Sequence, residues 1–87
     1  MKIEYNTGDV VKSLAGHDRD QIFALMSVVN DNYVMIIDGK RRKISNPKLK
    51  KVKHLQKISS CDILASEILN GSITDKKVLK ALNQYKQ

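Results

Sequence analysis

The chain has 87 residues with a formal net charge of +7, and 41% of its residues are hydrophobic and 29% charged, which suits one small globular domain with a modest core. Its longest apolar runs, residues 22–26 and 33–37, fall far below the roughly 18 residues that span a bilayer. The composition therefore argues against a membrane-spanning segment, and a chain this short leaves little room for an active-site cleft.

Cysteine usage and the start of the sequence bear on the cellular compartment. The single cysteine, Cys61, cannot form a disulfide within the chain, and residues 1–5 lack the apolar stretch of a secretory signal. We therefore expect a cytoplasmic protein. Because no linker or repeat interrupts the sequence, we expect residues 1–58 to form a β-rich unit and residues 59–87 a helical pair packed on it, as a single structural unit.

Residues 7–55 are typical of short strands separated by turns. A first strand is expected over residues 10–14, followed by a loop at 15–20 whose glycine and aspartates suit unusual backbone angles. A second strand over about 21–29 and a third over 33–37 are joined by a tight turn of Asn and Asp residues. Next, Asp38-Gly39 suits a type I′ hairpin turn, in which both central residues need positive φ, and this predicts a fourth strand over Lys40–Ile44.

Both faces of the second and third strands are apolar. Ile22 and Met26 alternate along the second strand with Phe23 and Leu25. A strand with two apolar faces needs cover on both sides. One face can point into a small barrel, whereas the other must be covered by the C-terminal part of the chain or by a partner.

The C-terminal third changes from strand to helical spacing. Pro47 is expected to end the fourth strand, and apolar residues then recur every third position to Ile58, which favours a 3₁₀ turn or an irregular edge segment over a regular strand. A helix is expected from an N-cap at Ser59 or Ser60 to a glycine stop at residues 70–71. A second helix, capped by Ser72 or Thr74, carries an apolar stripe: Val78, Leu79, Leu82 and Tyr85.

Charge is distributed unevenly along the chain. The basic segment, residues 40–57, contains nine Lys or Arg residues and no Asp or Glu. Residues 1–39 contain three basic and six acidic side chains, and residues 58–87 contain four basic and three acidic ones, so the flanks sum to −2. Nine like charges so close together repel one another, and phosphates would neutralise them. The basic segment therefore indicates a polyanionic partner more strongly than a merely solvated surface.

The basic segment contains no aromatic residue; the aromatic residues of the chain are Tyr5, Phe23, Tyr33 and Tyr85. The segment therefore has no aromatic ring on which a base could stack, and this favours recognition of the shape of a nucleic-acid backbone. Structured RNA fits that description, and duplex DNA fits it nearly as well from charge alone. Within the segment, Arg41 and Arg42 can engage phosphate bidentately, while the lysines act as point charges.

Two stretches resemble a known family. Residues 8–13 and 15–19 resemble a KOW segment, the short motif of ribosomal and transcription-elongation proteins. Residues 31–39, with Arg42-Lys43 and the Pro-Lys-Leu-Lys-Lys run at residues 47–51, are similar to the small bacterial KOW-domain RNA-binding proteins. That group is in turn similar to the archaeal and eukaryotic ribosomal proteins of the L-fourteen-e type.

The resemblance covers about residues 7–55 and implies an SH3-like (KOW) barrel whose basic loops hold RNA. The chain departs from the pattern at residues 17–20, which are His-Asp-Arg-Asp where relatives commonly carry Arg-Asp-Lys-Gly. Asp20 can adopt a left-handed backbone geometry at some cost, but it brings a carboxylate close to any RNA phosphate there. The departure shifts the expected RNA contact from this loop to residues 40–57.

Neither catalysis nor metal binding is predicted. The sequence offers no set of nucleophile, base and oxyanion donors and no glycine loop for phosphates. One cysteine and two histidines that lie 37 positions apart do not supply the ligands of a zinc site, so we predict no metal, no cofactor and no small-molecule substrate. A membrane-surface role for the basic segment is disfavoured because no Trp or Phe anchors it.

Together these arguments predict a fold that is mainly β with C-terminal helices, an SH3-like small barrel of four to five strands followed by a helical hairpin. They predict a non-enzymatic protein that docks on the backbone of structured RNA, with ribosomal RNA and ribosomal proteins as partners. The alternatives are a KOW protein-interaction module of the translation or transcription machinery and a nonspecific DNA binder. The residues predicted to contact RNA are Lys12, Arg19, Lys40, Arg41, Arg42, Lys43, Lys48, Lys50, Lys51, Lys53 and His54.

Overall fold

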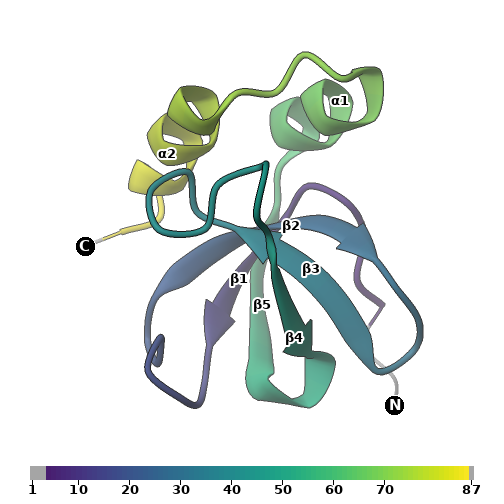
Figure 1. Cartoon of the computed structure of the whole chain (residues 1–87), viewed down its shortest axis with the longest axis vertical. Helices are drawn as coiled ribbons and strands as arrows, with labels where there is room; N and C mark the ends of the chain where they lie inside the picture. Colours follow the sequence, from purple (N-terminus) through teal and green to yellow (C-terminus); the bar gives the residue numbers. More distant parts are fainter. Residues whose placement is uncertain (1–3, 87) are drawn as a thin grey trace.

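The fold is a five-stranded antiparallel sheet with two helices on one side, as the computed structural model of residues 4–86 shows (Figure 1). The prediction of a mainly β fold with C-terminal helices is therefore confirmed. Residues 1–3 and 87, which the predicted units 1–58 and 59–87 include, lie outside the described residues. The strands, which lie in the order β4-β3-β2-β1-β5 across the sheet, are β1 (Asp9–Ser13), β2 (Ile22–Val28), β3 (Tyr33–Ile37), β4 (Lys48–Lys51) and β5 (Leu55–Ser60).

The sheet curls so that its two edges approach each other. β4 and β5 form opposite edges, yet a single 3₁₀ turn, Val52–His54, is all that joins them. Three residues cannot cross a flat sheet of five strands, because neighbouring strands lie about 4.8 Å apart. The pairing of the neighbouring strands β1 and β5 continues into this turn, where the Leu14 amide donates to the His54 carbonyl at 2.8 Å.

The first three strands match the sequence-based prediction, and the turn between β2 and β3 forms as its composition indicates. Asn30 Oδ1 accepts hydrogen bonds from the Asn32 and Tyr33 amides at 2.8 and 3.0 Å. An asparagine side chain that satisfies its own following amides in this way is a common turn device.

The predicted fourth strand at residues 40–44 is wrong. Residues 38–46 form a loop, and the strand that pairs with β3 lies later, over Lys48–Lys51, with Leu49 opposite Met35. Pro47 therefore precedes a strand instead of ending one, which agrees with its lack of an amide donor for a ladder. The stretch left open between a 3₁₀ turn and an irregular segment contains the 3₁₀ turn and two strands, β4 and β5.

Hydrophobic side chains pack on both faces of the sheet. On the inner face of the curl, six buried residues form one cluster: Val11, Phe23, Leu25, Val34, Ile36 and Leu55. On the outer face, a second cluster joins the sheet to both helices: Val10, Ala24, Ile37, Leu64, Val78 and Leu82. The alternation in β2 thus supplies both clusters, and the helices cover the face that the sequence left in need of cover.

Helix α1 (Asp62–Asn70) begins later than predicted, because Ser59 and Ser60 continue β5 and pair with β1. Its N-cap position is Cys61, and it ends as predicted at Gly71, whose φ of 79° is the left-handed conformation that glycine tolerates. Helix α2 (Asp75–Asn83) begins at Thr74, whose hydroxyl accepts from the Lys77 amide at 3.2 Å. Over the part of the chain described, neither helix has the length and apolarity needed to cross a membrane.

Candidate nucleic-acid interface

Loop 38–46 carries four consecutive basic residues, and its shape is set by an aspartate. Asp38 Oδ1 accepts hydrogen bonds from the Lys40 amide at 2.9 Å and the Arg42 amide at 2.8 Å. The Asp38 and Gly39 amides in turn donate to the Arg42 carbonyl, at 2.9 and 3.2 Å. These bonds use amides that a strand would have needed for its ladder, so the chain turns back on itself and presents its side chains outward.

The same loop is anchored on helix α2, beside which it lies in Figure 1. The Ile44 amide donates to Asp75 Oδ1 at 2.8 Å, and the Ile44 side chain packs against the outer-face cluster. Gly39, with φ of 79°, lies so close to α2 that a Cβ atom there would collide with the Asp75 carbonyl. The basic residues therefore project from a fixed frame and not from a loose hairpin tip.

The loop between β1 and β2 is held by a buried carboxylate. Asp18 is 8% exposed, and its oxygens accept from Lys48 Nζ at 2.7 Å, Ser13 Oγ at 2.7 Å and Lys50 Nζ at 3.0 Å. Lys50 Nζ also donates to the Ala15 carbonyl at 3.0 Å. Burial alone would raise the pKa of Asp18, but the hydrogen bonds from Lys48, Ser13 and Lys50 outweigh it and hold the pKa well below its usual range.

Asp20 adopts the left-handed backbone that the sequence departure requires, with φ of 70°. Its amide donates to the Ser13 carbonyl at 2.8 Å, which closes the loop. The carboxylate is exposed, with one oxygen 3.8 Å from Lys12 Nζ. At that distance in solvent the pair is weak, so the Lys12 charge stays available to an anion.

The predicted RNA contacts divide into groups with different surroundings. Lys40, Arg41 and Lys43 are exposed and Arg42 is half-buried; within residues 4–86, none of these four side chains has a hydrogen-bond or ion-pair partner. Arg19 is exposed on the β1–β2 loop. By contrast, Lys48 and Lys50 are committed to Asp18, and Lys50 is almost wholly buried.

The remaining predicted contacts lie at the other end of β4. Lys51 and Lys53 are exposed and His54 is half-buried, and Lys51 Nζ lies 5.9 Å from the centre of the Tyr33 ring, within the range of a cation–π contact. Lys57, although part of the basic segment, pairs with the buried Asp9 at 3.3 Å. The basic segment is thus divided between a free group on loop 38–46, a second group around the 3₁₀ turn, and three lysines paired with aspartates.

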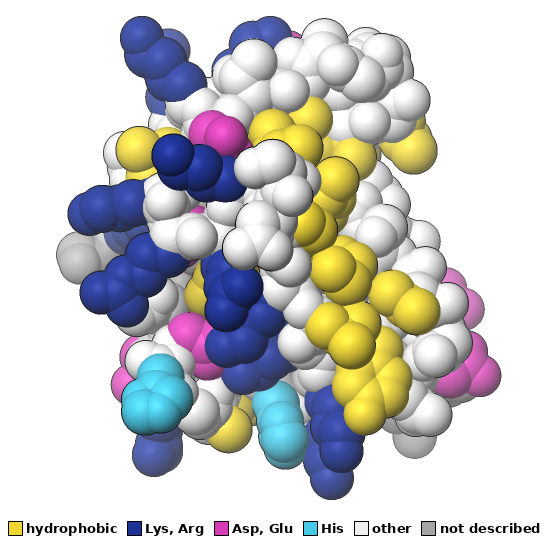
Figure 2. All heavy atoms as spheres, in the orientation of Figure 1, with side chains coloured by type: hydrophobic (Ala, Val, Ile, Leu, Met, Phe, Trp, Pro, Cys, Tyr) yellow, Lys and Arg dark blue, Asp and Glu magenta, His cyan; other side chains and the backbone are white. Residues whose placement is uncertain are grey.

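Two adjoining hollows lie beside the loop group. The smaller, of about 140 Å³, is lined on its basic side by His17, Arg41, Arg42 and Lys48. The larger is a groove of about 800 Å³ that shares Gln21, Asp38 and Arg41 with the smaller one. In Figure 2, Lys and Arg side chains gather on the side of the molecule that carries loop 38–46, beside a band of hydrophobic side chains.

Residues from both ends of the chain line the groove. Lys12 enters from β1, Lys40 and Arg41 from loop 38–46, and Tyr85 and Lys86 from the end of the chain after α2. Sequence reasoning missed Tyr85 and Lys86 as candidate functional residues, because Tyr85 fits the apolar stripe of α2 and nothing local links it to Arg41. The groove combines four cations and the two carboxylates of Asp20 and Asp38 with an aromatic ring, and this net positive lining suits a ligand that has both phosphate and planar groups.

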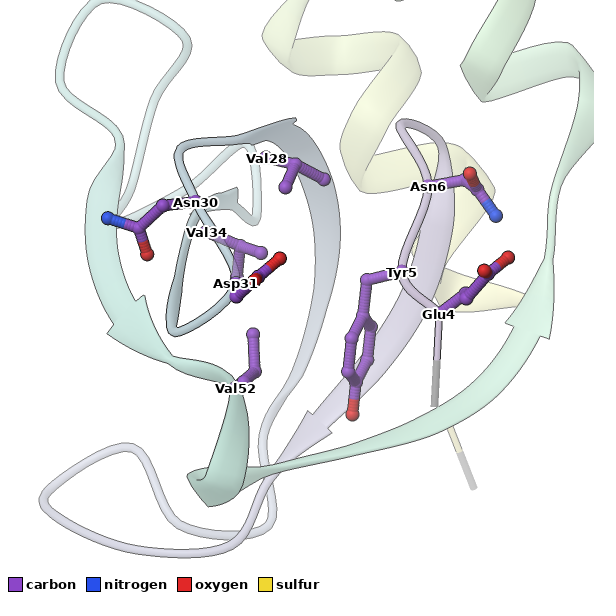
Figure 3. A pocket seen from close by; sticks show the side chains of 8 residues that line it. All are labelled: Glu4, Tyr5, Asn6, Val28, Asn30, Asp31, Val34 and Val52. Atoms are coloured by element: carbon purple, nitrogen blue, oxygen red, sulfur yellow. The ribbon is translucent and has the colours of Figure 1, made fainter. Parts of the chain in front are cut away.

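A third hollow, of about 220 Å³, has a different character. Figure 3 shows the ring of Tyr5 across from the side chains of Val34 and Val52, and two of the other lining residues, Glu4 and Asp31, are acidic. Tyr5 donates its hydroxyl hydrogen to the Leu55 carbonyl at 3.2 Å; burial, and to a smaller extent the charge of Asp9, raises its pKa. An acidic, largely apolar hollow of this kind is unsuited to phosphate.

In the described part of the chain, no three side chains of the metal-binding types come together as a possible ion site. No protein-family model matches this chain, and a search of the curated proteins finds no match either. The geometry of the basic surface therefore carries the functional argument.

Proposed function

We propose that this protein is a non-enzymatic RNA-binding protein that docks on the phosphate backbone of structured RNA, and that it acts on or near the ribosome in the cytoplasm. The resemblance to KOW-domain proteins supports the choice of RNA over DNA. It also supports the proposal that the curled sheet is a small SH3-like barrel, as does the 3₁₀ turn that joins its two edge strands.

One observation carries the proposal: the basic loop keeps its charge although aspartates lie around it. The Asp38 carboxylate accepts hydrogen bonds from the amides of Lys40 and Arg42, and the Asp75 carboxylate accepts one from the Ile44 amide. Asp18 is neutralised by lysines from β4. The nearby acids therefore hold the loop in place without pairing with its four cationic side chains, which is the arrangement that a polyanion needs.

The mechanism is electrostatic docking. The Arg41 and Arg42 guanidinium groups can each engage a phosphate through two hydrogen bonds, and Lys40 and Lys43 add point charges beside them. Binding releases counterions from the RNA, so the affinity should fall steeply with salt. Because the loop is anchored at Gly39 and Ile44, little conformational freedom is lost on binding.

The test is a salt series of binding measurements by fluorescence anisotropy, with an RNA hairpin and a DNA duplex of equal length. We expect Arg41→Ala/Arg42→Ala to weaken RNA binding at least tenfold and to flatten the salt slope by about 2, roughly one for each phosphate contact removed. The matched control is Lys51→Ala/Lys53→Ala, which removes the same charge from the other end of β4 and should change affinity less. Equal losses in both variants would refute the location, and affinity independent of salt would refute the mechanism.

A second candidate function rests on apolar side chains beside the basic surface. Leu49 on β4 is 53% exposed and lies opposite the half-buried Met35 of β3, which is the kind of surface that a protein partner covers. Co-sedimentation with ribosomes separates the two readings. RNA docking predicts that Arg41→Ala/Arg42→Ala abolishes co-sedimentation and that Leu49→Ser keeps it, and a protein-interaction module predicts the reverse.

A further inference from the structure

The 800 Å³ groove differs from the other two hollows in both size and lining. Its volume lies within the range of about 300–1,000 Å³ in which proteins hold organic ligands, whereas the hollows of 140 and 220 Å³ fall below it. Its rim carries four cations, Lys12, Lys40, Arg41 and Lys86, and two carboxylates. Asp38 accepts hydrogen bonds from the Lys40 and Arg42 amides, and Asp20 lies 3.8 Å from Lys12 Nζ, so the rim keeps a net positive charge. A groove with this rim and this volume can take more of an RNA than a phosphate.

The floor of the groove is apolar and rests on the core. Ile22 and Tyr85 both pack against the outer-face cluster between the sheet and the helices, and Ile58 of β5 lies beside them. Tyr85 is also fixed by its backbone, because its amide donates to the Leu82 carbonyl at 2.9 Å. The tyrosine is therefore held in place before any ligand arrives.

Tyr85 is the aromatic residue that remains available to a nucleic acid. The Phe23 ring is 2% exposed, the Tyr33 ring already faces Lys51, and Tyr5 lies in the acidic hollow. Of the four aromatic residues, Tyr85 is the one that meets three conditions. It is part of the lining of a hollow with several cations, its side chain is not fully buried, and no lysine within residues 4–86 contacts its ring. The fold thus supplies the stacking surface that the basic segment lacks.

We propose that the groove receives the base of an unpaired nucleotide of the bound RNA, stacked on the ring of Tyr85. The phosphates on either side of that nucleotide lie against Lys40 and Arg41, and the side-chain amide of Gln21 offers a donor and an acceptor to the edge of the base. The inference rests on the proposed RNA-binding function and narrows its target from any structured RNA to RNA with an extruded or looped-out nucleotide.

The first experiment uses the wild-type protein with two RNA probes. One is a hairpin whose stem carries a single bulged 2-aminopurine, and the other is the same hairpin with that base paired. Stacking on an aromatic ring quenches 2-aminopurine, so we expect binding to quench the bulged probe further and to leave the paired probe unchanged. Binding that leaves the bulged base as bright as it was in the free RNA overturns the inference.

The second experiment compares two variants at the ring. Tyr85→Leu keeps an apolar side chain against the core but removes the stacking surface, and Tyr85→Phe is the control that keeps the ring. We expect Tyr85→Leu to weaken binding to the bulged hairpin about fivefold or more, and Tyr85→Phe to bind within about twofold of the wild type. Thermal unfolding of both variants checks that the fold is retained.

The outcomes separate this inference from the proposed function. If Tyr85→Leu weakens binding to both hairpins equally while Arg41→Ala/Arg42→Ala still weakens binding at least tenfold, backbone docking stands and the base site is refuted. If neither hairpin binds the wild-type protein, both proposals fall. A free mononucleotide, added as a competitor, should displace the bulged RNA only at concentrations far above the affinity of the RNA; displacement at equal concentration would make the ligand a nucleotide and overturn the RNA assignment.

Discussion

Replacing Asp18 by asparagine removes one charge from the buried cluster that holds the β1–β2 loop. In the native protein, the single carboxylate of Asp18 pairs with both Lys50, whose side chain is 9% exposed, and Lys48, whose side chain is 29% exposed. The asparagine oxygen can still accept a hydrogen bond, but the Lys50 ammonium is left buried without a counter-charge. Breaking a buried ion pair in this way costs about 3–5 kcal/mol, and we expect about 3 kcal/mol because one acceptor remains.

That loss is large for a domain of this size. The free energy of unfolding of a small domain is about 5–15 kcal/mol, so the variant should stay folded at room temperature but lose much of its margin. Each kcal/mol of lost unfolding free energy lowers the melting temperature of a domain of this size by about 4–8 °C, so we expect Tm to fall by roughly 10–25 °C. Thermal and urea unfolding followed by circular dichroism measure both quantities.

The pH dependence gives a second, independent readout. Because the pKa of Asp18 is lower in the folded protein than its ordinary value of 3.8, its contribution to stability is complete above that value and is lost as the pH falls below it. The gap in unfolding free energy between the wild type and Asp18→Asn should therefore be constant near neutral pH and should shrink between about pH 4 and about pH 2.

The matched control is Asp20→Asn, two residues further along the same loop. Its carboxylate is 73% exposed and 3.8 Å from Lys12, and asparagine tolerates the same left-handed backbone, so we expect a change below about 0.5 kcal/mol. If Asp18→Asn proved no less stable than this control, or if its deficit did not change with pH, the buried ion pairs would not be what holds the loop.

Three further predictions concern the basic loop and its support. Gly39→Ala should destabilise the protein by more than about 1 kcal/mol in urea unfolding, because the new methyl group meets the Asp75 carbonyl and φ stays positive. Asp38→Ala removes a negative charge, yet it should weaken RNA binding because the loop loses its two hydrogen bonds to the Asp38 side chain. Asp38→Asn keeps a hydrogen-bond acceptor and should bind RNA at least as tightly as the wild type. Thr74→Ala should cost about 1 kcal/mol of unfolding free energy through the lost N-cap of α2.

The parts of the fold that sequence reasoning predicted are those that local alternation determines. The sequence predicts β3 at residues 33–37 and two apolar faces of β2 that both need cover, because side chains of a strand must alternate between faces. The structure covers both faces with buried clusters. The glycine stop at Gly71 and the cap at Thr74 likewise depend on neighbouring residues alone. Nothing distant competes with these signals.

The fourth strand was misplaced because a distant contact decided it. The Asp38-Gly39 pair fits a two-residue hairpin turn, but in the structure the Asp38 side chain accepts a hydrogen bond from the Arg42 amide. The Ile44 amide donates to Asp75, which lies 31 positions away in the sequence. A local pattern cannot show that a helix near the end of the chain will supply that acceptor. The pairing of Asp18 with Lys48 and Lys50 is likewise a contact between residues far apart in the sequence. The sequence does indicate that the two lysines share a face, because they occupy alternate positions of one strand.

This pairing changes what the charge of the basic segment means for binding. Nine cations would give a salt slope near −8 if each met a phosphate, at about −0.9 for each contact on duplex DNA. Lys48 and Lys50 share the carboxylate of Asp18, and Lys57 pairs with Asp9, so six cations are left without a carboxylate partner among the described residues; of these six, Lys40 and Arg41 line the groove. The charge that the sequence shows as one block is therefore divided by the fold: its paired lysines hold the loops of the sheet, and its unpaired residues on loop 38–46, which Asp38 and Asp75 hold in place, are those that we propose to bind RNA.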